Sequence, residues 1–410
     1  MGSWVVDWRV WMLTDCGREL YRLLEERHLS LREAARRAEC SPGYLSNVSH
    51  GRKSLTPRVA ARLDSVLRTS GTFATYALAT PAAGFLPPDA DPDMPPGGIS
   101  RGNAMAVIAA LGEILPGYIR ADRLVGSAAL VLPLRGHVAT VERACEVARG
   151  QDRADALAFA SRYVEFCGWA HQDAGDLGRA MQWTSTALDY AVELGDQRTI
   201  AYTLMRKASI ATEGGMPGHG AGMASAALAH DKALTPRLRA VILRQRAQAS
   251  AALREPEAAL RDADAAVAEA VAGVSQGEDD RAPYCSPVYA AMEAGAVRLR
   301  LADPEAALTL LERSLSQWPD GSQARDHALF LARRAAAYAA MGERDQARAA
   351  AEDALTAAAG LASRRVTGQL AALAGQLATW QDDPGTAATL RKLAAAAGTH
   401  TTVVMQGGPP

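Results

Sequence analysis

Apolar and polar residues recur with the period of an α-helix from residue 104 to about residue 398, and the first 78 residues carry shorter stretches of the same pattern. Ala, Leu, Arg and Glu dominate at helical spacing, and no alternation typical of strands interrupts them. The pattern therefore predicts an all-α protein. We expect an N-terminal bundle of short helices followed by a longer helical array.

Two short helices joined by a tight turn are predicted between Ser30 and Arg52. Ser30 is a helix-capping residue, and Glu33 completes a capping box with it. The apolar face that follows consists of Leu31, Ala34, Ala35 and Ala38. Ser41 and Pro42 give a second start signal, a capping hydroxyl followed by proline at the first helical position.

The second of these helices is expected to be buried through Leu45 and Val48 and to end at Gly51. A preceding helix is predicted over residues 17–28, with its leucines on one side. A following helix is predicted to begin at Thr56-Pro57 and to run to Leu67. The four helices form one compact module of residues 17–78.

This module resembles the lambda-repressor-like, XRE-family class of helix-turn-helix domains, including its Tyr44-Leu45-Ser46 and Gly51-Arg52-Lys53 signatures. The resemblance implies a DNA reader whose second helix lies in the major groove. The implied base-edge residues are Ser41, Gly43, Tyr44, Ser46 and Asn47, and the implied phosphate contacts are Arg32, Arg36, Arg52 and Lys53. Many members have glutamine where Leu31 and Arg36 stand, so backbone clamping here depends more on charge. A helical bundle that contacts protein instead is the alternative.

The charge distribution favours the DNA reader. Residues 17–70 hold eleven Arg and Lys against six Asp and Glu, a net of +5, which leaves −6 for the rest of a chain with a formal net charge of −1. A basic head suits contact with phosphates, and an acidic body stays off the duplex.

The N-terminal extension, residues 1–16, is a poor signal peptide because Asp7 and Arg9 interrupt it and no basic region precedes it. It is read either as a non-native start before Met12 or as an aromatic arm for dimerisation built from Trp4, Trp8 and Trp11. The chain has five cysteines without metal-ligand spacing, which predicts reduced, mostly buried thiols in a cytoplasmic protein. No uninterrupted apolar run reaches about 18 residues, so no membrane span is expected.

Residues 79–103 are rich in proline and glycine and are predicted to be an extended linker. Beyond them, helices recur in pairs. The segments that share a turn, an acidic or proline start and small residues at matched places are 173–188, 253–267, 301–319, 341–355 and, more weakly, 382–396. Residues 104–150 are helical without matching this repeat, and we read them as a cap or a dimerisation element; residues 399–410 are a tail.

The paired segments resemble the tetratricopeptide repeat, a unit of about 34 residues with two helices. The resemblance implies an α-solenoid over residues 104–398. Small residues are required where paired helices approach closely; the matched ones are Gly168, Ala180 and Ala187 in one repeat and Ala335, Ala347 and Ala354 in another. Tyr338, Gly342 and Pro319 also fit. The stretch MPGHG at 216–220 is interpreted as extra loop within the second unit.

Motifs for phosphate binding, zinc proteolysis, nucleophilic hydrolysis and dinucleotide binding are missing from the sequence. GMPGHGAG at 215–222 is glycine-rich but has no preceding strand and no lysine, so it is interpreted as a loop. We expect no enzyme activity, no metal and no cofactor.

Binding is the expected role of the repeats. In arrays of this kind the first helix of each pair lines the concave face, and the resemblance implies a ligand groove there. Its implied residues are Arg162, Glu165, Trp169, Gln172, Tyr202, Met205, Ser209, Arg244, Gln248, Tyr289 and Met292. Packing between helices is the competing interpretation of the aromatic and methionine residues.

Two kinds of protein combine such heads and repeats. Peptide-pheromone receptors of Gram-positive bacteria hold peptide with asparagines, but the only asparagines here are Asn47 and Asn103. The order of segments looks more like the large regulators of high-GC Gram-positive bacteria. The sequence thus predicts a cytoplasmic, homodimeric regulator that binds double-stranded DNA and senses a small metabolite, peptide or protein partner. The alternative is an interaction scaffold.

Overall fold

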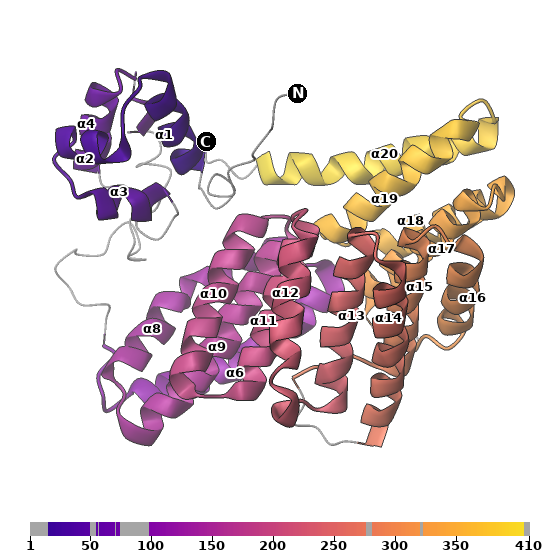
Figure 1. Ribbon diagram of the computed structural model, residues 1–410, viewed down its shortest axis with the longest axis horizontal. Coiled ribbons are helices and arrows are strands. Elements are labelled where there is room, and N and C mark those ends of the chain that lie inside the picture. Colours follow the sequence, from indigo (N-terminus) through magenta and orange to yellow (C-terminus); the bar gives the residue numbers. More distant parts are fainter. Residues whose placement is uncertain are drawn as a thin grey trace. The chain divides into compact units, whose positions relative to one another are not determined.

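The computed structural model of the chain describes residues 15–49, 55, 57–69, 71–73, 98–275, 281–319 and 323–405. The chain divides into two compact units, Met1–Gly98 and Ile99–Pro410, and each is described by itself. Every regular element in the described ranges is a helix, which confirms the all-α prediction (Figure 1).

The first unit contains α1 (Asp15–Glu26), α2 (Leu31–Arg37), α3 (Pro42–Ser49) and α4 (Pro57–Val66). The α1 helix ends before His28, whose φ of 51° lies in the left-handed region. The predicted terminator Gly51 lies outside the described residues, as do the N-terminal extension up to residue 14 and most of the predicted linker. The core of the unit includes Leu20, Leu23, Ala34, Ala35, Ala38, Leu45, Val48, Ala60, Leu63, Leu67 and Phe73.

The predicted helix starts in this unit are observed, with one difference. The Ser30 hydroxyl oxygen accepts a hydrogen bond from the backbone N–H of Glu33 at 3.1 Å, and the Ser41 hydroxyl oxygen accepts one from Tyr44 at 3.0 Å. The Glu33 carboxylate does not complete the capping box. It instead accepts hydrogen bonds from Arg36 and Arg37, 2.9 and 2.7 Å away, because these arginines lie one turn further along the same helix.

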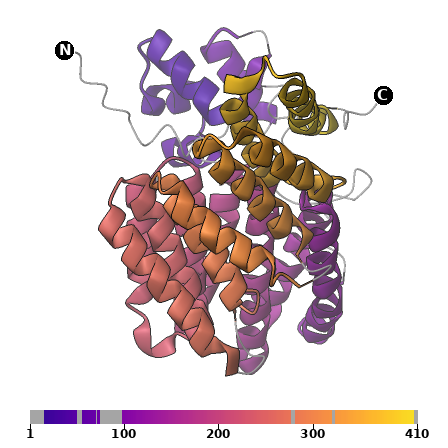
Figure 2. The ribbon, with the colours of Figure 1, turned by 90° about the vertical axis from the view of Figure 1, so that its right-hand side faces the viewer.

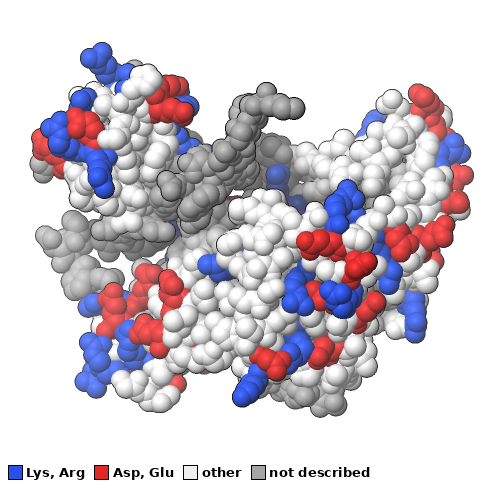
Figure 3. Space-filling view, viewed as in Figure 1, with Lys and Arg blue, Asp and Glu red and all other residues white. Residues whose placement is uncertain are grey.

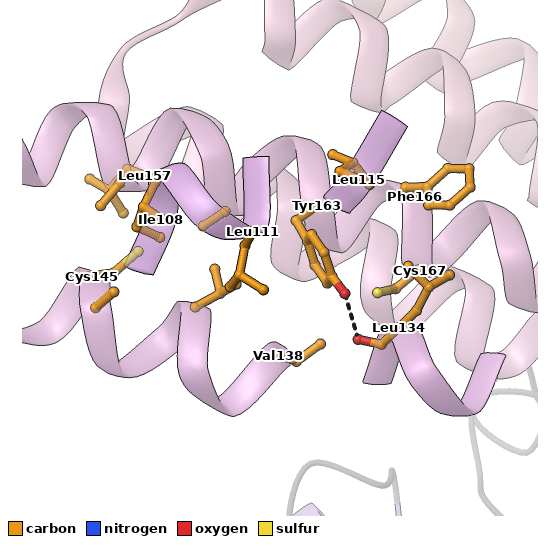
Figure 4. Packing of buried hydrophobic residues seen from close by; sticks show 14 of the residues in the cluster. Ile108, Leu111, Leu115, Leu134, Val138, Cys145, Leu157, Tyr163, Phe166 and Cys167 are labelled. Carbon is orange, nitrogen blue, oxygen red and sulfur yellow. Dashed lines mark hydrogen bonds between the residues drawn. The ribbon is translucent and has the colours of Figure 1, made fainter. Parts of the chain in front are cut away.

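The second unit begins with α6 (Ala104–Val125), α7 (Val131–Gly136) and α8 (Val138–Val147), which pack against α9 (Gly150–Asp173). Figure 4 shows Ile108, Leu111, Leu115 and Val138 pointing into this core. The buried Tyr163 hydroxyl donates a hydrogen bond to the Leu134 carbonyl oxygen at 3.0 Å. Residues 104–150 therefore form the helices α6, α7 and α8 and pack on α9.

One described helix, Ala104–Leu124, is long and apolar enough to cross a membrane by length and composition alone. Such a helix is weak evidence for a membrane span, because core helices of soluble proteins pass the same test. Here Ile108, Leu111 and Leu115 are buried against neighbouring helices.

Six antiparallel pairs follow, with α9 the first helix of the first pair (Figures 1 and 2). The pairs are α9 with α10 (Leu177–Leu194), α11 (Gln197–Glu213) with α12 (Pro217–Leu228), α13 (Pro236–Ala252) with α14 (Pro256–Ala272), α15 (Pro287–Arg300) with α16 (Pro304–Leu315), α17 (Ala324–Ala340) with α18 (Arg344–Ala358), and α19 (Arg364–Leu377) with α20 (Pro384–Met405). Short 3₁₀ turns occupy Ala128–Leu130, Asp231–Ala233, Gly273–Ser275 and Ala378–Trp380.

The small residues predicted at helix crossings are buried. Ala180, Ala187, Ala335, Ala347 and Ala354 have no exposed surface. A Cβ added to Gly168 would lie 2.5 Å from the Thr184 hydroxyl oxygen, so the α9–α10 crossing excludes a side chain at that position. The close approach of paired helices is thus the physical reason for the repeated alanine and glycine.

The interpretation of residues 215–222 as an inserted loop is wrong. Pro217 is at the first turn of α12, where proline is favoured, and the helix continues through Gly218, Gly220 and Gly222; only Gly215 and Met216 precede it. Gly220 is the small residue of this crossing, since an added Cβ would lie 2.2 Å from the Thr212 hydroxyl oxygen. Gly220 therefore serves close packing in an ordinary member of the array, whereas a Cβ added to Gly215, Gly218 or Gly222 would meet no atom within 4 Å.

Candidate functional site

The first candidate surface is the exposed side of α2 and α3 in the first unit. Leu45 and Val48 are buried in the core, so α3 turns its other side outward. Ser41 and Gly43 are exposed, whereas Tyr44, Ser46 and Asn47 are half-buried. A Cβ added to Gly43 would meet no atom within 4 Å, so this glycine is not required for packing. The helix thus offers short polar side chains and an open backbone position on one side.

The arginines beside this surface lie in water and pair locally. Arg32 and Arg36 are exposed, and Arg36 shares the Glu33 carboxylate with Arg37. The two arginines lower the pKa of Glu33 to about 2, mainly through the hydrogen bond from Arg36. Figure 3 shows basic and acidic side chains intermixed on the visible face of the unit. Arg52 and Lys53, the other implied phosphate contacts, lie outside the described residues.

The second candidate surface lies on the first helices of the repeat pairs. We call it the inner face and define it by Glu165 and Trp169 on α9, Arg206 on α11, Arg244 on α13, Glu293 on α15 and Arg325 on α17. These side chains contact one another across neighbouring helices, as the hydrogen bonds below show.

The first and the fifth repeat pairs meet at the inner face, beside α6. The Arg325 guanidinium donates to both carboxylate oxygens of Asp122 on α6, at 3.0 and 3.1 Å. It also lies 3.5 Å from the carboxylate of Asp173, which accepts a hydrogen bond from the Ser363 hydroxyl at 2.6 Å. Because α9 belongs to the first pair and α17 to the fifth, the array must curl around this face. The inner face is therefore the inside of a curve.

A second cluster lies between α9 and α11. The buried Arg206 donates to the Glu165 carboxylate at 2.7 Å and to the Gln172 side-chain oxygen at 2.8 Å. The Gln172 amide in turn donates to Ser209 at 3.2 Å and to Glu213 at 2.7 Å. These hydrogen bonds give partners to polar groups whose burial without partners would destabilise the fold.

A third cluster is centred on Glu293. Arg333 donates to one carboxylate oxygen at 2.8 Å, while Arg244 and Gln248 donate to the other at 3.3 and 3.2 Å. Burial by itself would raise the pKa of Glu293, but the attraction of Arg333 and Arg244 outweighs it and lowers the pKa to about 2. Arg244 also donates to the Tyr289 hydroxyl at 3.1 Å.

The structure gathers most of the residues that the sequence assigned to a groove, but not as one open surface. Glu165, Trp169, Tyr202, Ser209 and Gln248 are half-buried, and Arg162 is exposed. Gln172, Arg244 and Tyr289 are buried within the polar clusters. Met205 and Met292 have no exposed surface and pack in the hydrophobic core, so their expected place on the groove surface is wrong.

Sequence reasoning missed the charged residues beside these methionines. Arg206 lies four positions after Tyr202, and Glu293 lies four positions after Tyr289, so each shares a helix face with the tyrosine. The four-residue spacing from a predicted groove tyrosine was the signal that could have identified Arg206 and Glu293. For Asp122, Asp173, Arg325 and Ser363 the sequence held no comparable signal, because their contacts join residues that are 152 to 203 positions apart.

The described residues contain no group of three or more His, Cys, Asp or Glu placed to hold a metal ion. The five cysteines are free thiols, and all but the half-buried Cys40 are buried. Two surface hollows lie away from the clusters above. One is polar and includes Asp196, Arg198 and Arg281; the other is apolar and includes Leu355, Leu361 and Leu370.

Comparison with known proteins identifies the first unit. Residues 15–73 match the family described as "Helix-turn-helix domain". No curated protein matches the chain at a significant level. Among solved structures, a Rap protein complexed with Competence and Sporulation Factor aligns with 14% identity and a TM-score of 0.45, covering 74% of this chain and 97% of that one.

A second solved structure that aligns is Bacillus thuringiensis PlcR in complex with the peptide PapR7 and DNA. It is 11% identical with a TM-score of 0.35, and the alignment covers 74% of this chain and 94% of that chain. The chain thus carries a helix-turn-helix domain at residues 15–73, followed by an α-helical repeat array.

Proposed function

We propose that this chain is a sequence-specific DNA-binding transcription regulator and that its repeat array senses a ligand or a protein partner. The single observation that carries the proposal is the helix-turn-helix match at residues 15–73. The exposed polar side of α3 supports it, because a recognition helix needs side chains that can reach base edges.

In this proposal the base-edge residues are Ser41, Gly43, Tyr44, Ser46 and Asn47, and the phosphate contacts are Arg32, Arg36, Arg52 and Lys53. The protein acts in the cytoplasm as a homodimer, because one such head makes too few contacts for specificity. It is not an enzyme and uses no cofactor. We place the head in the XRE family and the chain among regulators of secondary metabolism or development in high-GC Gram-positive bacteria.

The effector binds at the inner face, because residues from α9, α11, α13, α15 and α17 lie there. The effector is a small metabolite, a peptide or a protein partner, and peptide is the least favoured because the array has no asparagine. Binding shifts the array only if the effector prefers one curvature of the array over another.

The test is selection of duplexes from a randomised library by the full-length protein, followed by titration of variants on a selected site. Asn47→Ala should relax sequence choice at one position, at a cost of roughly 1–3 kcal/mol on the preferred site. Arg36→Ala should weaken binding to all sequences alike and reduce the salt slope by about one.

Arg22→Ala is the matched control, because Arg22 is also exposed and paired with glutamates of its own helix but lies on α1. It should leave the salt slope unchanged. Failure of the full-length protein to select any duplex in low salt would overturn the DNA-binding proposal and favour the interaction scaffold, whose head contacts protein.

A further inference from the structure

One side of α6 is buried, and the opposite side is exposed. Ile108, Leu111 and Leu115 point into the core of the second unit (Figure 4). The residues on the opposite side recur at intervals of three or four positions, and we call this side the outer face of α6. The outer face consists of Ala109, Ala110, Glu113, Gly117, Arg120 and Leu124. All of these residues are exposed except Gly117, which is half-buried.

The outer face is more apolar than a helix side in contact with water usually is. The α6 helix is apolar enough to cross a membrane by composition, yet only 22% of its most apolar stretch is buried. Leu124 is 70% exposed, and Ile114, at the edge of the outer face, is 42% exposed. A helix packed on a protein core normally carries charged and polar residues on its solvent side. The composition of the outer face therefore suits contact with a partner better than contact with water.

The outer face carries one charge of each sign. None of the described residues forms a hydrogen bond or an ion pair with the Glu113 carboxylate or the Arg120 guanidinium. The two residues are seven positions apart, about 10 Å along the helix axis, which is too far for a pair within one helix. The Arg120 guanidinium lies along the outer face, because a Cβ added to Gly117 would be 3.9 Å from its Nη2 atom. Both charges are therefore available to a partner.

The spacing of these charges is self-complementary. A second α6 in antiparallel orientation, related by a two-fold axis between Pro116 and Gly117, places Glu113 of each copy opposite Arg120 of the other. The same register places the exposed Leu124 of each copy opposite the small Ala109. Every contact in a two-fold interface occurs twice, so this arrangement forms two ion pairs. A parallel arrangement would place each charge opposite its own copy and would be repulsive.

We propose that the outer face of α6 binds the outer face of a second copy of this chain in the antiparallel register. This inference rests on the homodimer of the proposed function and names its interface. Alanine and glycine suit such an interface, because the distance between two packed helices depends on the side chains at the contact. A membrane surface fits less well, because Glu113 in the middle of the face would lose its water without gaining a partner.

The test is sedimentation velocity of the full-length protein and of two charge reversals, Glu113→Arg and Arg120→Glu. Each reversal places like charges opposite one another twice in a homodimer and should raise the dimer dissociation constant on the order of tenfold. An equimolar mixture of the two variants should dimerise as the wild type does. In the mixed dimer one copy is positive at both positions and the other is negative at both, so both pairs are restored.

Arg123→Glu is the matched control, because it makes the same charge change at another exposed position of α6. Arg123 lies about 100° around the helix from Leu124, to one side of the outer face, and its reversal should leave the dissociation constant unchanged. Far-UV circular dichroism checks that each variant is folded. All of the substituted side chains are exposed, so we expect each variant to fold.

The proposal is overturned if the wild type is a monomer, if both reversals dimerise as the wild type does, or if their mixture does not recover the dimer. Dimers that ignore both reversals would place the interface elsewhere. A monomer that pellets with phosphatidylcholine vesicles would assign the outer face to a membrane instead. Duplex binding by the same preparations tests the DNA-binding proposal separately, since a dimer that binds no duplex would leave this interface standing.

Discussion

In the helix-turn-helix unit, Arg22, Arg36 and Arg37 pair with glutamates three or four positions away and remain in water. In the repeat array, Arg325 pairs with Asp122 across 203 positions, and both side chains are less than 10% exposed. Surface pairs contribute little to stability, whereas a buried charge that loses its partner is costly. The same residue types thus have different roles in the two units.

This difference suits the exposed arginines to binding a partner and the buried arginines to holding the helices together. Exposed arginines on α2 can exchange an intramolecular glutamate for a phosphate at small cost. The arginines of the inner face are held by several hydrogen bonds each, and moving one of them disturbs helices from distant pairs. We therefore expect substitutions in the first unit to change affinity for DNA and substitutions on the inner face to change stability first.

Arg325→Met should have the largest effect on stability. It leaves Asp122 and Asp173 buried without their cation and should lower the free energy of unfolding by about 3–5 kcal/mol. Urea unfolding of the full-length protein, followed by circular dichroism, measures the change. Adding Asp122→Asn and Asp173→Asn should restore much of the loss, since no uncompensated charge then remains. A loss below about 1 kcal/mol for Arg325→Met alone would show that the closing contact does not hold the array together.

Glu293 and Glu33 sharpen the comparison, because both have a pKa of about 2 but only Glu293 is buried. A carboxyl whose pKa is lower in the folded state stabilises the protein above its unfolded pKa, and this stabilisation is lost as the pH falls through the folded pKa. Between about pH 4.5 and pH 2 the wild type should therefore lose roughly 2–3 kcal/mol through Glu293.

Unfolding free energies of Glu293→Gln over that pH window should fall less steeply than those of the wild type. Glu33→Gln is the control, because Glu33 is screened by water and its substitution should leave the slope nearly unchanged. Equal slopes for the wild type and Glu293→Gln would contradict the assignment.

Two glycines of the first unit give the third comparison. A Cβ at Gly17 would lie 2.1 Å from the carbonyl oxygen of Ser49, so Gly17→Ala should force α1 away from α3 and cost about 1–3 kcal/mol. A Cβ at Gly43 meets nothing, and Gly43→Ala should leave stability equal or raise it by up to about 1 kcal/mol. The melting midpoints of the two variants measure these stability changes. A larger loss of stability for Gly43→Ala than for Gly17→Ala would contradict the prediction.

The first unit was predictable almost entirely because its signals are local. Ser30 and Ser41 cap helices that begin at the next residue, and the apolar spacing selected the buried residues of α2 and α3. The array was predictable as a class because alanine and glycine recur at its helix crossings. The segment from Met216 to Gly220 was misread, since proline and glycine indicate a turn in isolation, whereas here they start α12 and allow its close approach to α11.

The sequence by itself determined the helical class, the helix-turn-helix unit and the repeated pairing, because caps, helical period and small residues act within a few turns. Only the tertiary structure decided which residues form the inner face. It buried Met205 and Met292 in the hydrophobic core and placed Arg206 and Glu293 inside polar clusters. It also brought Asp122, Trp169, Arg325 and Arg365 together. The physical reason is that the curl of the array accumulates over many helix crossings, so no local pattern specifies which distant residues will meet.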